Sequence, residues 1–362
     1  MKEKTIMKKR FVAALLTAAM GMSLVACGGS KAPASSAAPA SSAPAASSEA
    51  AQYKPGEFKL KIATVVSGEH AWIKMGDYIT EELNKRSNGA IEVTVAPGGQ
   101  LGNDEATIED MRLGTLDMVI GGTQNAAPFV SQYQILAMAY LFPSRDAFES
   151  VLVQNGEVFN YIQSKYDENG LGLKLLGLSN GGQRDLHTNV PVEKLADLKN
   201  QKMRVTSSAT ESKVWSTLGA IPTSMSFNDI YSGVQTNTVS AFECTLASYK
   251  SNALYEVAPY HIKTAHQFTP THVTCSEITW NKLPAEFQTL LMEVIDEACQ
   301  LGTKLADEAD DSLLDTLVAE NGVKVCEPDK AEFKAAVEPL YAEIAAGCKG
   351  EDLLEIINGL IA

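Results

Sequence analysis

Residues 201–246, QKMRVTSSATESKVWSTLGAIPTSMSFNDIYSGVQTNTVSAFECTL, decide the fold of this chain. Three short runs rich in apolar residues, QKMRV, AIPTSM and VSAFECTL, are typical of strands. The stretches between them, SATESKVWSTLG and SFNDIYSGVQTN, each begin at a serine that can cap a helix. Strands that alternate with helices predict an α/β fold.

The same alternation runs through residues 58–122, nearer the N-terminus. FKLKIATVV places Phe58, Leu60 and Ile62 on one face of a strand, and AWIKMGDYITEELNKRSNG follows as an amphipathic helix. AIEVTVAP and TLDMVIGG predict two more strands, with a helix that starts after Asn103 between them. Because a glycine-rich stretch, SNGGQRDLHTN, separates the two α/β units, we expect two lobes with a cleft between them. Ligands of such sheets bind beyond the carboxyl ends of the strands, where the helices begin.

The first 52 residues differ in composition from the rest. Cations precede an apolar run, FVAALLTAAMGMSLVA, which is too short to span a bilayer comfortably and is flanked like a secretory signal. The run leads into LVACGGS, which resembles the lipobox of bacterial lipoproteins, so Cys27 is expected to be diacylated and to become the mature N-terminus. An ordinary signal, with Cys27 as a spare thiol, is the alternative. We expect a lipoprotein signal peptide at 1–26 and an Ala/Ser/Pro-rich disordered tether at 27–52.

Charge and cysteine usage argue against several classes of protein. The formal net charge is −14, and removal of the basic leader makes the mature chain more acidic, which disfavours nucleic acid or anionic lipid as a partner. The cysteines after Cys27 are widely spaced and odd in number, so neither a disulfide framework nor a zinc site is expected, and most should be small core residues. His261, His266 and His272 lack the spacing of a metal site, so no metal is expected.

Four stretches, in order along the chain, resemble one family: GGQLGNDEATIEDMRLGTLDM, GGQRDLHTN, the run from LADLKNQKMRV to VSAFEC, and YEVAPYHIKTAHQ. They are similar to the solute-binding proteins of TRAP transporters (tripartite ATP-independent periplasmic type, DctP family) over roughly 58–341. The resemblance implies a two-lobed, periplasmic-binding-protein-like α/β fold with a hinge, a ligand cleft and a long C-terminal helix that braces both lobes. We expect 57–181 plus 270–309 to form lobe I, and 182–269 plus 310–362 to form lobe II.

The same resemblance implies a function without bond-making chemistry, so the chain is not expected to be an enzyme, and no cofactor is implied. A protein of this family captures an organic acid between its lobes and delivers it to a membrane permease. The expected partners are therefore the acid, the permease subunits of a TRAP transporter, and the membrane that holds the lipid on Cys27. We expect an exported monomer, anchored to the outer face of the cell membrane or to its periplasmic side.

Two arginines are the first candidates for holding the acid. A guanidinium presents a rigid fork that matches a carboxylate, and it stays charged at any working pH. In the family's pattern, the arginine matched by Arg204, in KMRV, holds the solute carboxylate, and Arg184, in GGQRDLHTN, matches a second arginine at the lobe junction. From the residues alone, Arg204 could instead pair with Asp197 or Glu243. Arg184 could be a solvated loop cation beside Asp185.

Five further residues are candidate ligand contacts. Phe227 matches an aromatic that packs against the solute in some relatives, although a Phe in this place could equally be core. In AFECTL, Glu243 keeps the first half of the family's Glu-Asn pair, whereas Cys244 stands where relatives commonly have the asparagine that hydrogen-bonds the solute. A thiol cannot replace an amide, so Thr245 is a candidate for the missing polar contact. His70, at the carboxyl end of the first strand, is expected to face the cleft; a solvent-facing helix start is the alternative.

The sequence does not name the acid. A hexuronate or related sugar acid is the first expectation and a four-carbon dicarboxylate the second, because several polar groups lie near the predicted cleft: His70, Glu69, Thr245 and Tyr249. Two other classes stay open. One is a lipid-anchored surface receptor or adhesion module, which leaves the two arginines unexplained. The other, less favoured, is a hydrolase that uses Cys244 or Glu243.

Overall fold

The computed structural model describes residues 53–362, so the expected signal peptide and tether, including Cys27, lie outside the described residues. Within that range a mixed sheet has the strand order β2-β1-β3-β8-β4-β7-β5-β6, with β9 paired to β8. The strands are β1 (Phe58–Ala63), β2 (Ile91–Ala96), β3 (Met118–Gly122), β4 (Leu173–Thr188), β5 (Lys202–Val205), β6 (Ile221–Ser224), β7 (Ala241–Thr245), β8 (Tyr260–Ser276) and β9 (Lys324–Cys326). The α-helices are α1 (Ala71–Arg86), α2 (Asp104–Leu113), α3 (Thr123–Ala126), α4 (Tyr133–Leu136), α5 (Arg145–Glu149), α6 (Glu157–Glu168), α7 (Ala209–Thr217), α8 (Ile230–Gln235), α9 (Leu246–Ser251), α10 (Glu277–Trp280), α11 (Ala285–Asn321), α12 (Lys330–Val337), α13 (Tyr341–Cys348) and α14 (Glu351–Leu360).

Local sequence signals set the ends of these helices. Asn103 precedes α2, and its side-chain oxygen accepts a hydrogen bond from the Ala106 amide at 2.9 Å. The same helix ends at Gly114, which has the left-handed φ of 73°. Ser208 caps α7 by accepting from the Glu211 amide. Each cap satisfies a backbone group that has no partner within its helix, so the helix starts predicted after Asn103 and at Ser208 are confirmed. Ser226 makes no side-chain cap; it precedes a single 3-10 turn, and α8 begins only at Ile230.

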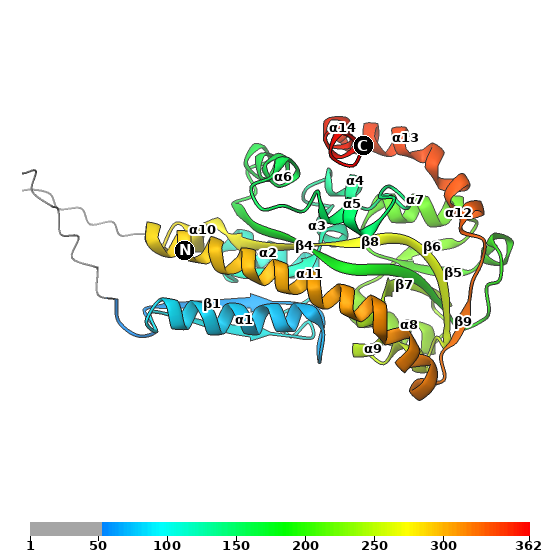
Figure 1. Ribbon diagram of the computed structural model, residues 1–362, viewed down its shortest axis with the longest axis horizontal. Coiled ribbons are helices and arrows are strands. Elements are labelled where there is room, and N and C mark those ends of the chain that lie inside the picture. The colour runs from blue at the N-terminus through cyan, green and yellow to red at the C-terminus, as the bar shows by residue number, and fades with distance from the viewer. Residues whose placement is uncertain (1–52) are drawn as a thin grey trace, which may run out of the picture. The chain divides into compact units, whose positions relative to one another are not determined.

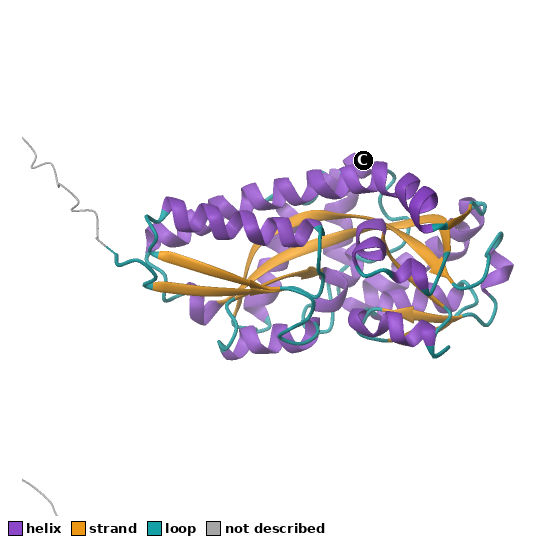
Figure 2. Ribbon diagram, turned by 90° about the horizontal axis from the view of Figure 1, so that it is seen from below, coloured by secondary structure: helices purple, strands orange, loops and turns teal. Residues whose placement is uncertain are grey.

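Two long antiparallel strands, β4 and β8, run through both halves of the sheet (Figure 1). Segment 173–180 of β4 pairs with 270–276 of β8, and β3, β1 and β2 extend the sheet from there. Beyond a bulge between Asn180 and Gln183, β4 pairs with segment 260–268 of β8 and with β7, which leads on to β5 and β6. Figure 2 shows the strands of the two halves joined by this long pair. Each half is an α/β unit, which confirms the two-lobed fold.

The glycine-rich stretch between the lobes lies inside β4 rather than in a loop. Gly182 has a φ of +103°, a conformation that residues with a side chain rarely adopt. Its amide donates to Asn180 Oδ1 at 2.9 Å, and the Gln183 amide donates to Asp310 Oδ2 of α11 at 2.7 Å. Two adjacent glycines disfavour a strand, so the sequence suggests a break, but a bulge accommodates them without ending β4.

Helices cover both faces of the sheet and supply the cores. In the first lobe, Met75 of α1 and Val294 of α11 belong to one core, and Ile162 of α6 belongs to the core on the other face. In the second lobe, Trp215 of α7 and Tyr249 of α9 belong to two separate cores. Both faces of the sheet are therefore buried, as an α/β fold requires.

The long helix α11 has 37 residues and runs past both lobes (Figure 1). Its first half buries Leu291, Ile295 and Ala298 in a core of the first lobe. Leu317, near its end, is buried in a core of the second lobe. The bracing helix implied by the family resemblance is confirmed, and its apolar stripe is core rather than a membrane face.

The C-terminal helices differ from the expected lobe bounds. Helix α12 packs in the second lobe through Phe333 and Val337. Helices α13 and α14 instead bury Ile344, Leu353 and Ile357 in the core of the first lobe that also contains α6. The expectation that 310–362 lies wholly in lobe II is therefore wrong for its last two helices, because their apolar stripes are buried on lobe I. The remaining lobe bounds stay a prediction.

Three further features concern the described residues. No helix between residues 53 and 362 is long and apolar enough to cross a bilayer. The cysteines in this range are Cys244, Cys275, Cys299, Cys326 and Cys348; they are buried and free, as core residues are expected to be. The same range contains no group of three or more His, Cys, Asp and Glu side chains placed to hold a metal ion.

We expect Gly177→Ala to destabilise the protein by about 1–3 kcal/mol, the usual range for overpacking a core. A Cβ at this position of β4 would lie 2.6 Å from the Cys299 Sγ and 2.9 Å from Ile295 Cγ2 of α11, so the helix would have to move away from the sheet. Urea unfolding followed by circular dichroism measures the change.

The control for this substitution is Gly347→Ala. This exposed glycine of α13 has no heavy atom within 4 Å of an added Cβ. Alanine is the better helix former, so the control should gain up to about 1 kcal/mol of stability. Equal effects of the two substitutions would contradict the close approach of α11 to β4.

Candidate functional site

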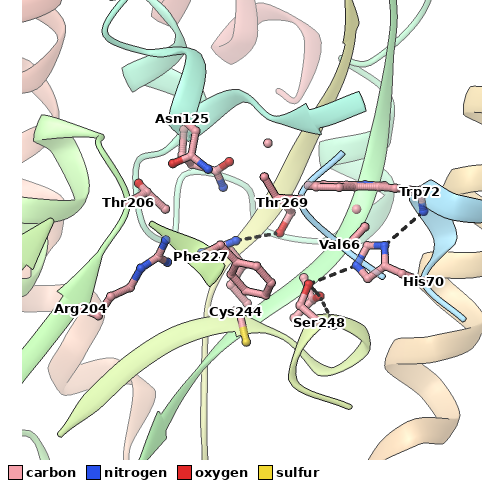
Figure 3. A pocket seen from close by; sticks show the side chains of 16 residues that line it. Val66, His70, Trp72, Asn125, Arg204, Thr206, Phe227, Cys244, Ser248 and Thr269 are labelled. Carbon is pink, nitrogen blue, oxygen red and sulfur yellow. Dashed lines mark hydrogen bonds between the residues drawn. The ribbon is translucent and has the colours of Figure 1, made fainter. Parts of the chain in front are cut away.

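A small, largely enclosed cavity lies at the carboxyl ends of β1, β3, β5 and β7, where the two lobes face each other (Figure 3). The first lobe lines it with Val65, Val66, His70, Trp72, Gly122, Gln124 and Asn125. The second lobe and the long strands contribute Gly181, Arg184, Arg204, Thr206, Phe227, Cys244, Thr245, Ser248 and Thr269. The cavity lies where the sequence predicted a cleft.

Arg204, on β5, is buried with 1% of its surface exposed and points its guanidinium into the cavity (Figure 3). Its Nε donates to the Met225 carbonyl at 2.9 Å, and no carboxylate of residues 53–362 forms an ion pair with it. Asp197 accepts bonds from backbone amides near its own turn instead. Burial lowers the pKa of Arg204, but a guanidinium keeps its proton at working pH. The site therefore contains a buried positive charge that has no ion-pair partner among residues 53–362.

Arg184, on β4, does have a partner. Its Nη2 donates to Glu243 Oε1 of β7 at 2.6 Å, and its Nε donates to the other oxygen of the same carboxylate. Nη1 lies 3.4 Å from Thr269 Oγ1. Burial alone would raise the pKa of Glu243, but the charge of Arg184 outweighs it and, with His266 nearby, lowers this pKa to about 2. Arg184 and Glu243 thus form a neutral buried pair.

The pleat of the sheet explains why Glu243 pairs with Arg184 rather than with Arg204. Neighbouring residues along a strand point to opposite faces. On β7, the partner of Arg204 is Phe242, so Glu243 points to the other face. The partner of Arg184 is Thr245, which shares a face with Glu243. Strand register therefore gives the carboxylate to one arginine and leaves the other without it.

A hydrogen bond joins the two lobes at one wall of the cavity. His70 caps α1, and its Nδ1 accepts from the Trp72 amide at 3.1 Å, so Nε2 carries the proton. Nε2 lies 3.1 Å from Ser248 Oγ of α9 and donates to it. Burial lowers the pKa of His70 to about 4, so the ring is neutral at working pH. The Thr245 hydroxyl is committed to capping α9 and donates to Ser248 Oγ at 3.1 Å.

Amide side chains from the end of β3 line the opposite part of the cavity. Asn125 Nδ2 donates to Asp104 Oδ2 at 2.9 Å, behind the cavity wall. Burial, assisted by Glu105, raises the pKa of Asp104 to about 7. The Nε2 of Gln124 is buried and has no hydrogen-bond partner among the described residues. An unsatisfied buried donor in a cavity wall favours a ligand with an acceptor at that place.

The remaining walls are apolar or carry side chains without a reactive group. Trp72 donates through Nε1 to Thr271 Oγ1 at 3.0 Å, and Phe227 is half-buried against both lobes. Burial raises the pKa of the Cys244 thiol, so it is not a thiolate nucleophile. GLSNG, which includes Ser179, matches a hydrolase pattern, but this serine lies within β4 and not at a strand-to-helix turn.

The structure brings most of the expected site residues together. Arg204, Arg184, Phe227, Cys244, His70 and Thr245 line the cavity. Glu243 does not; it is fully buried behind them with Arg184. Sequence reasoning missed Trp72, Gln124, Asn125, Thr206, Ser248 and Thr269. The rule that ligands bind at carboxyl ends of strands could have indicated Gln124, Asn125 and Thr206, which directly follow β3 and β5.

Comparisons with known proteins find similar chains. Residues 62–347 match the model of the family described as bacterial extracellular solute-binding protein, family 7 (DctP). The chain is 30% identical over 282 residues to the 2,3-diketo-L-gulonate-binding periplasmic protein YiaO of Escherichia coli strain K12, covering 76% of this chain and 84% of that protein. A TRAP periplasmic solute-binding protein from Citrobacter koseri, solved with bound D-glucuronate, is 28% identical with a TM-score of 0.78 and covers 83% of this chain and 98% of that one. One from Roseobacter denitrificans OCh 114, with bound L-galactonate, is 28% identical with a TM-score of 0.77 and coverages of 85% and 100%.

We expect Glu243→Gln to destabilise the protein by about 3–5 kcal/mol at neutral pH, because it leaves the Arg184 guanidinium buried without a counter-charge. The folded-state pKa of Glu243, about 2, is below its usual value of 4.5. The pair therefore contributes its full stability above the usual value and loses it as the pH falls towards about 2. The difference in stability between parent and variant should narrow over that interval, as measured by urea unfolding at a series of pH values.

Glu343→Gln is the matched control for this prediction. It removes an exposed partner of Lys213, and exposed ion pairs contribute only about 0–1 kcal/mol. If Glu243→Gln cost no more than the control, or if its cost did not change in acid, the buried pair would not have the role assigned to it.

Proposed function

Because the chain belongs to family 7 of the bacterial extracellular solute-binding proteins, the DctP family, we propose that it captures an organic acid in the cavity between its lobes and delivers it to the permease of a TRAP transporter. The observation that carries the proposal is Arg204, a buried guanidinium in the cavity wall with no carboxylate partner among residues 53–362. The family consists of binding proteins rather than enzymes, so no bond-making step is proposed.

In this proposal the carboxylate of the acid pairs with Arg204. A buried charge is costly unless a counter-charge accompanies it, and a bidentate carboxylate fits the guanidinium fork. Arg184 lines the same cavity but is already neutralised by Glu243, so we assign it a supporting role in the wall. The two arginines thus differ in function because only one has a carboxylate from its own chain.

The other end of the cavity suits an acid with several hydroxyl groups. Gln124 presents an unpartnered donor there, Asn125 presents an amide, and His70 and Ser248 form a polar wall. A dicarboxylate would leave more of these groups unsatisfied, which is costly in a closed site. The relatives described above bind 2,3-diketo-L-gulonate, D-glucuronate and L-galactonate. We therefore place a hexuronate or related sugar acid first and a four-carbon dicarboxylate second.

Four side chains shape the cavity around the body of the acid. Phe227 and Trp72 offer aromatic surface from the two lobes, a common arrangement for sugar rings and carbon chains. Cys244 contacts the solute as a small neutral group, because its thiol is a weak donor. Thr245 supplies a contact through its methyl group, since its hydroxyl is occupied in capping α9.

We propose that the lobes open and close around the bulge of β4 near Gly182. Hydrogen bonds that cross between the lobes hold the closed form, among them that of His70 with Ser248 and one from Asn228 Nδ2 to the Gly98 carbonyl at 2.9 Å. Helix α11 contacts both lobes and limits the range of the motion. Ligand binding adds contacts from both sides of the cavity, so it favours the closed form.

Members of the family act outside the cytoplasm, and the N-terminal sequence fits this location. We propose that the leader at 1–26 is removed and that lipid on Cys27 holds the protein at the outer face of the membrane, with 27–52 as a tether. A tethered body stays near its permease yet is free to turn, which raises the effective concentration of the two partners.

We expect Arg204→Lys to weaken acid binding by about 30-fold or more, because an ammonium loses the bidentate fork and leaves a buried charge imperfectly paired. The measurement is a thermal-shift screen of parent and variant against uronates, aldonates, dicarboxylates and sialic acid, followed by calorimetry. A hundredfold excess over Kd stabilises the folded parent by about 2.7 kcal/mol.

The control for the screen is Arg112→Lys, at an α2 arginine that pairs with Glu109 away from the cavity and should leave affinity unchanged. Solution X-ray scattering of the same samples reports lobe closure as a decrease in radius of gyration with acid. Unchanged affinity in Arg204→Lys would remove the proposed carboxylate site, and a panel without any binding acid would remove the proposed function.

We expect Cys27→Ser to abolish lipid attachment, because the thiol is the acceptor of the diacylglyceryl group in the resemblance to lipoproteins. The parent should partition into the detergent phase and carry acyl mass on its N-terminal residue by mass spectrometry. The variant should stay in the aqueous phase with its solute affinity intact. An aqueous parent with a free Cys27 would show that the leader is an ordinary secretory signal.

A further inference from the structure

The wall of the acid site is backed by a buried carboxyl, Glu211, in the first turn of α7. Its Oε2 accepts hydrogen bonds from the amide and the hydroxyl of Thr206, at 3.1 and 2.6 Å. Thr206 lines the cavity and lies two residues after Arg204. Glu211 itself is 2% exposed and lies outside the cavity wall, so it acts on a ligand only through its neighbours.

The second oxygen of Glu211 is unsatisfied. Its Oε1 is buried, and no donor among residues 53–362 bonds to it. A carboxylate with one unpaired buried oxygen is costly, and the neutral acid is less so. Burial, assisted by the charge of Glu243, raises the pKa of Glu211 to about 7. Near neutral pH the group therefore exists in both protonation states.

Charged groups on several strands influence Glu211 electrostatically. Glu243 of β7 disfavours its ionised form, whereas Arg184 of β4 and Arg204 of β5 favour it. His266 of β8 lies 3.7 Å from Glu243 and packs edge-on against the tryptophan of α7. Arg184 is the stronger of the two cations, but it is already held by Glu243, so Arg204 is the cation whose effect on Glu211 a bound acid can change.

We infer that Glu211 is a positioning residue of the acid site and that it takes up a proton when a carboxylate pairs with Arg204. The inference rests on the proposed pairing of the solute with Arg204. When the solute neutralises that guanidinium, Glu211 loses a cation that favours its ionised form. The proton comes from solvent, and no other covalent bond forms or breaks. Neutral Glu211 still accepts the hydrogen bond from the Thr206 hydroxyl, so the cavity wall keeps its shape. The charge of Arg204 is then balanced by the ligand carboxylate alone.

Because binding takes up a proton, the affinity for the ligand is higher at low pH than at high pH. The bound carboxylate raises the pKa of Glu211 above its value of about 7 in the free protein, so affinity falls as the pH rises through 7 and beyond. A site with only fixed charges would show no such dependence between about pH 6 and 8.5, because a carboxylate and a guanidinium do not titrate there.

The test is isothermal titration calorimetry of the full chain with D-glucuronate, in buffers that differ in ionisation enthalpy. The parent should take up roughly half a proton per acid at about pH 7.5, and its Kd should weaken about tenfold from about pH 6 to 8.5. Glu211→Gln keeps an acceptor for Thr206; its uptake should fall below half of the parent's, the remainder coming from Asp104, which Arg204 also influences, and the change of its Kd over the same range should shrink to below about threefold. Glu332→Gln, at an exposed carboxyl of α12, should behave like the parent.

The inference fails if the parent takes up no proton or if Glu211→Gln takes up as much as the parent. It also fails if uptake is lost in Asp104→Asn and kept in Glu211→Gln, because Asp104 is a second buried carboxyl near Arg204 with a raised pKa. In each of these outcomes D-glucuronate still binds, so the proposed function stands.

A titration without ligand keeps the inference testable if Glu211→Gln does not fold. Carbon-13 NMR of the parent with labelled glutamate side chains follows Glu211 in the free protein. A midpoint near the usual pKa of 4.5 overturns the inference even where acids bind, and a midpoint near 7 supports it. If no acid binds, the proposed function fails, and the inference that rests on it fails as well.

Discussion

A guanidinium buried without a carboxylate is costly, because water no longer solvates its charge. The second lobe buries two guanidinium groups on β4 and β5, and among the described residues only Glu243 forms an ion pair with either of them. One ion-pairing carboxylate for two buried guanidinium groups gives the two arginines different environments. Arg184 is neutralised and becomes part of the wall, whereas Arg204 has no ion-pair partner among residues 53–362, and we propose that the solute supplies its counter-ion. The stability of the fold depends on the pairing of Glu243 with Arg184, and the proposed recognition of an acid depends on Arg204 being left without that carboxylate.

The register of the sheet determines which arginine pairs with Glu243, and the ends of its strands determine where the cavity lies. Strands β4 and β8 run through both lobes, so the bulge at Gly182 joins two α/β units without a separate linker. The carboxyl ends of β1 and β3 then face those of β5 and β7, and the residues that follow these strands meet across one cavity. Helix α11 packs on both lobes and keeps the two halves in register. The bulge lies inside a continuous strand, and the strand pairing is preserved on either side of it.

Much of the fold and part of the site could be predicted from the sequence. The alternation of strands and helices and the helix starts at Asn103 and Ser208 are local signals, and the structure confirms them. The site was predicted mainly from matched family positions, so residues without such a match were missed. Ser248 lines the cavity and hydrogen-bonds His70 of the other lobe, although the two residues are 178 positions apart in the chain. No local pattern encodes a contact of that kind.

The sequence by itself determined the element types, the α/β class, the acidic surface and the presence of two arginines suited to an acid, because these depend on residue type and short-range periodicity. Only the tertiary structure decided which arginine is free. The pleat sets Glu243 and Cys244 on opposite faces of β7, and the register of β7 against β4 and β5 turns the carboxylate towards Arg184. Tertiary packing also places Glu211 behind the cavity wall and buries the apolar stripes of α13 and α14 in a core of the first lobe. Such pairings arise from long-range packing, in which residues far apart in the chain compete for the same partner.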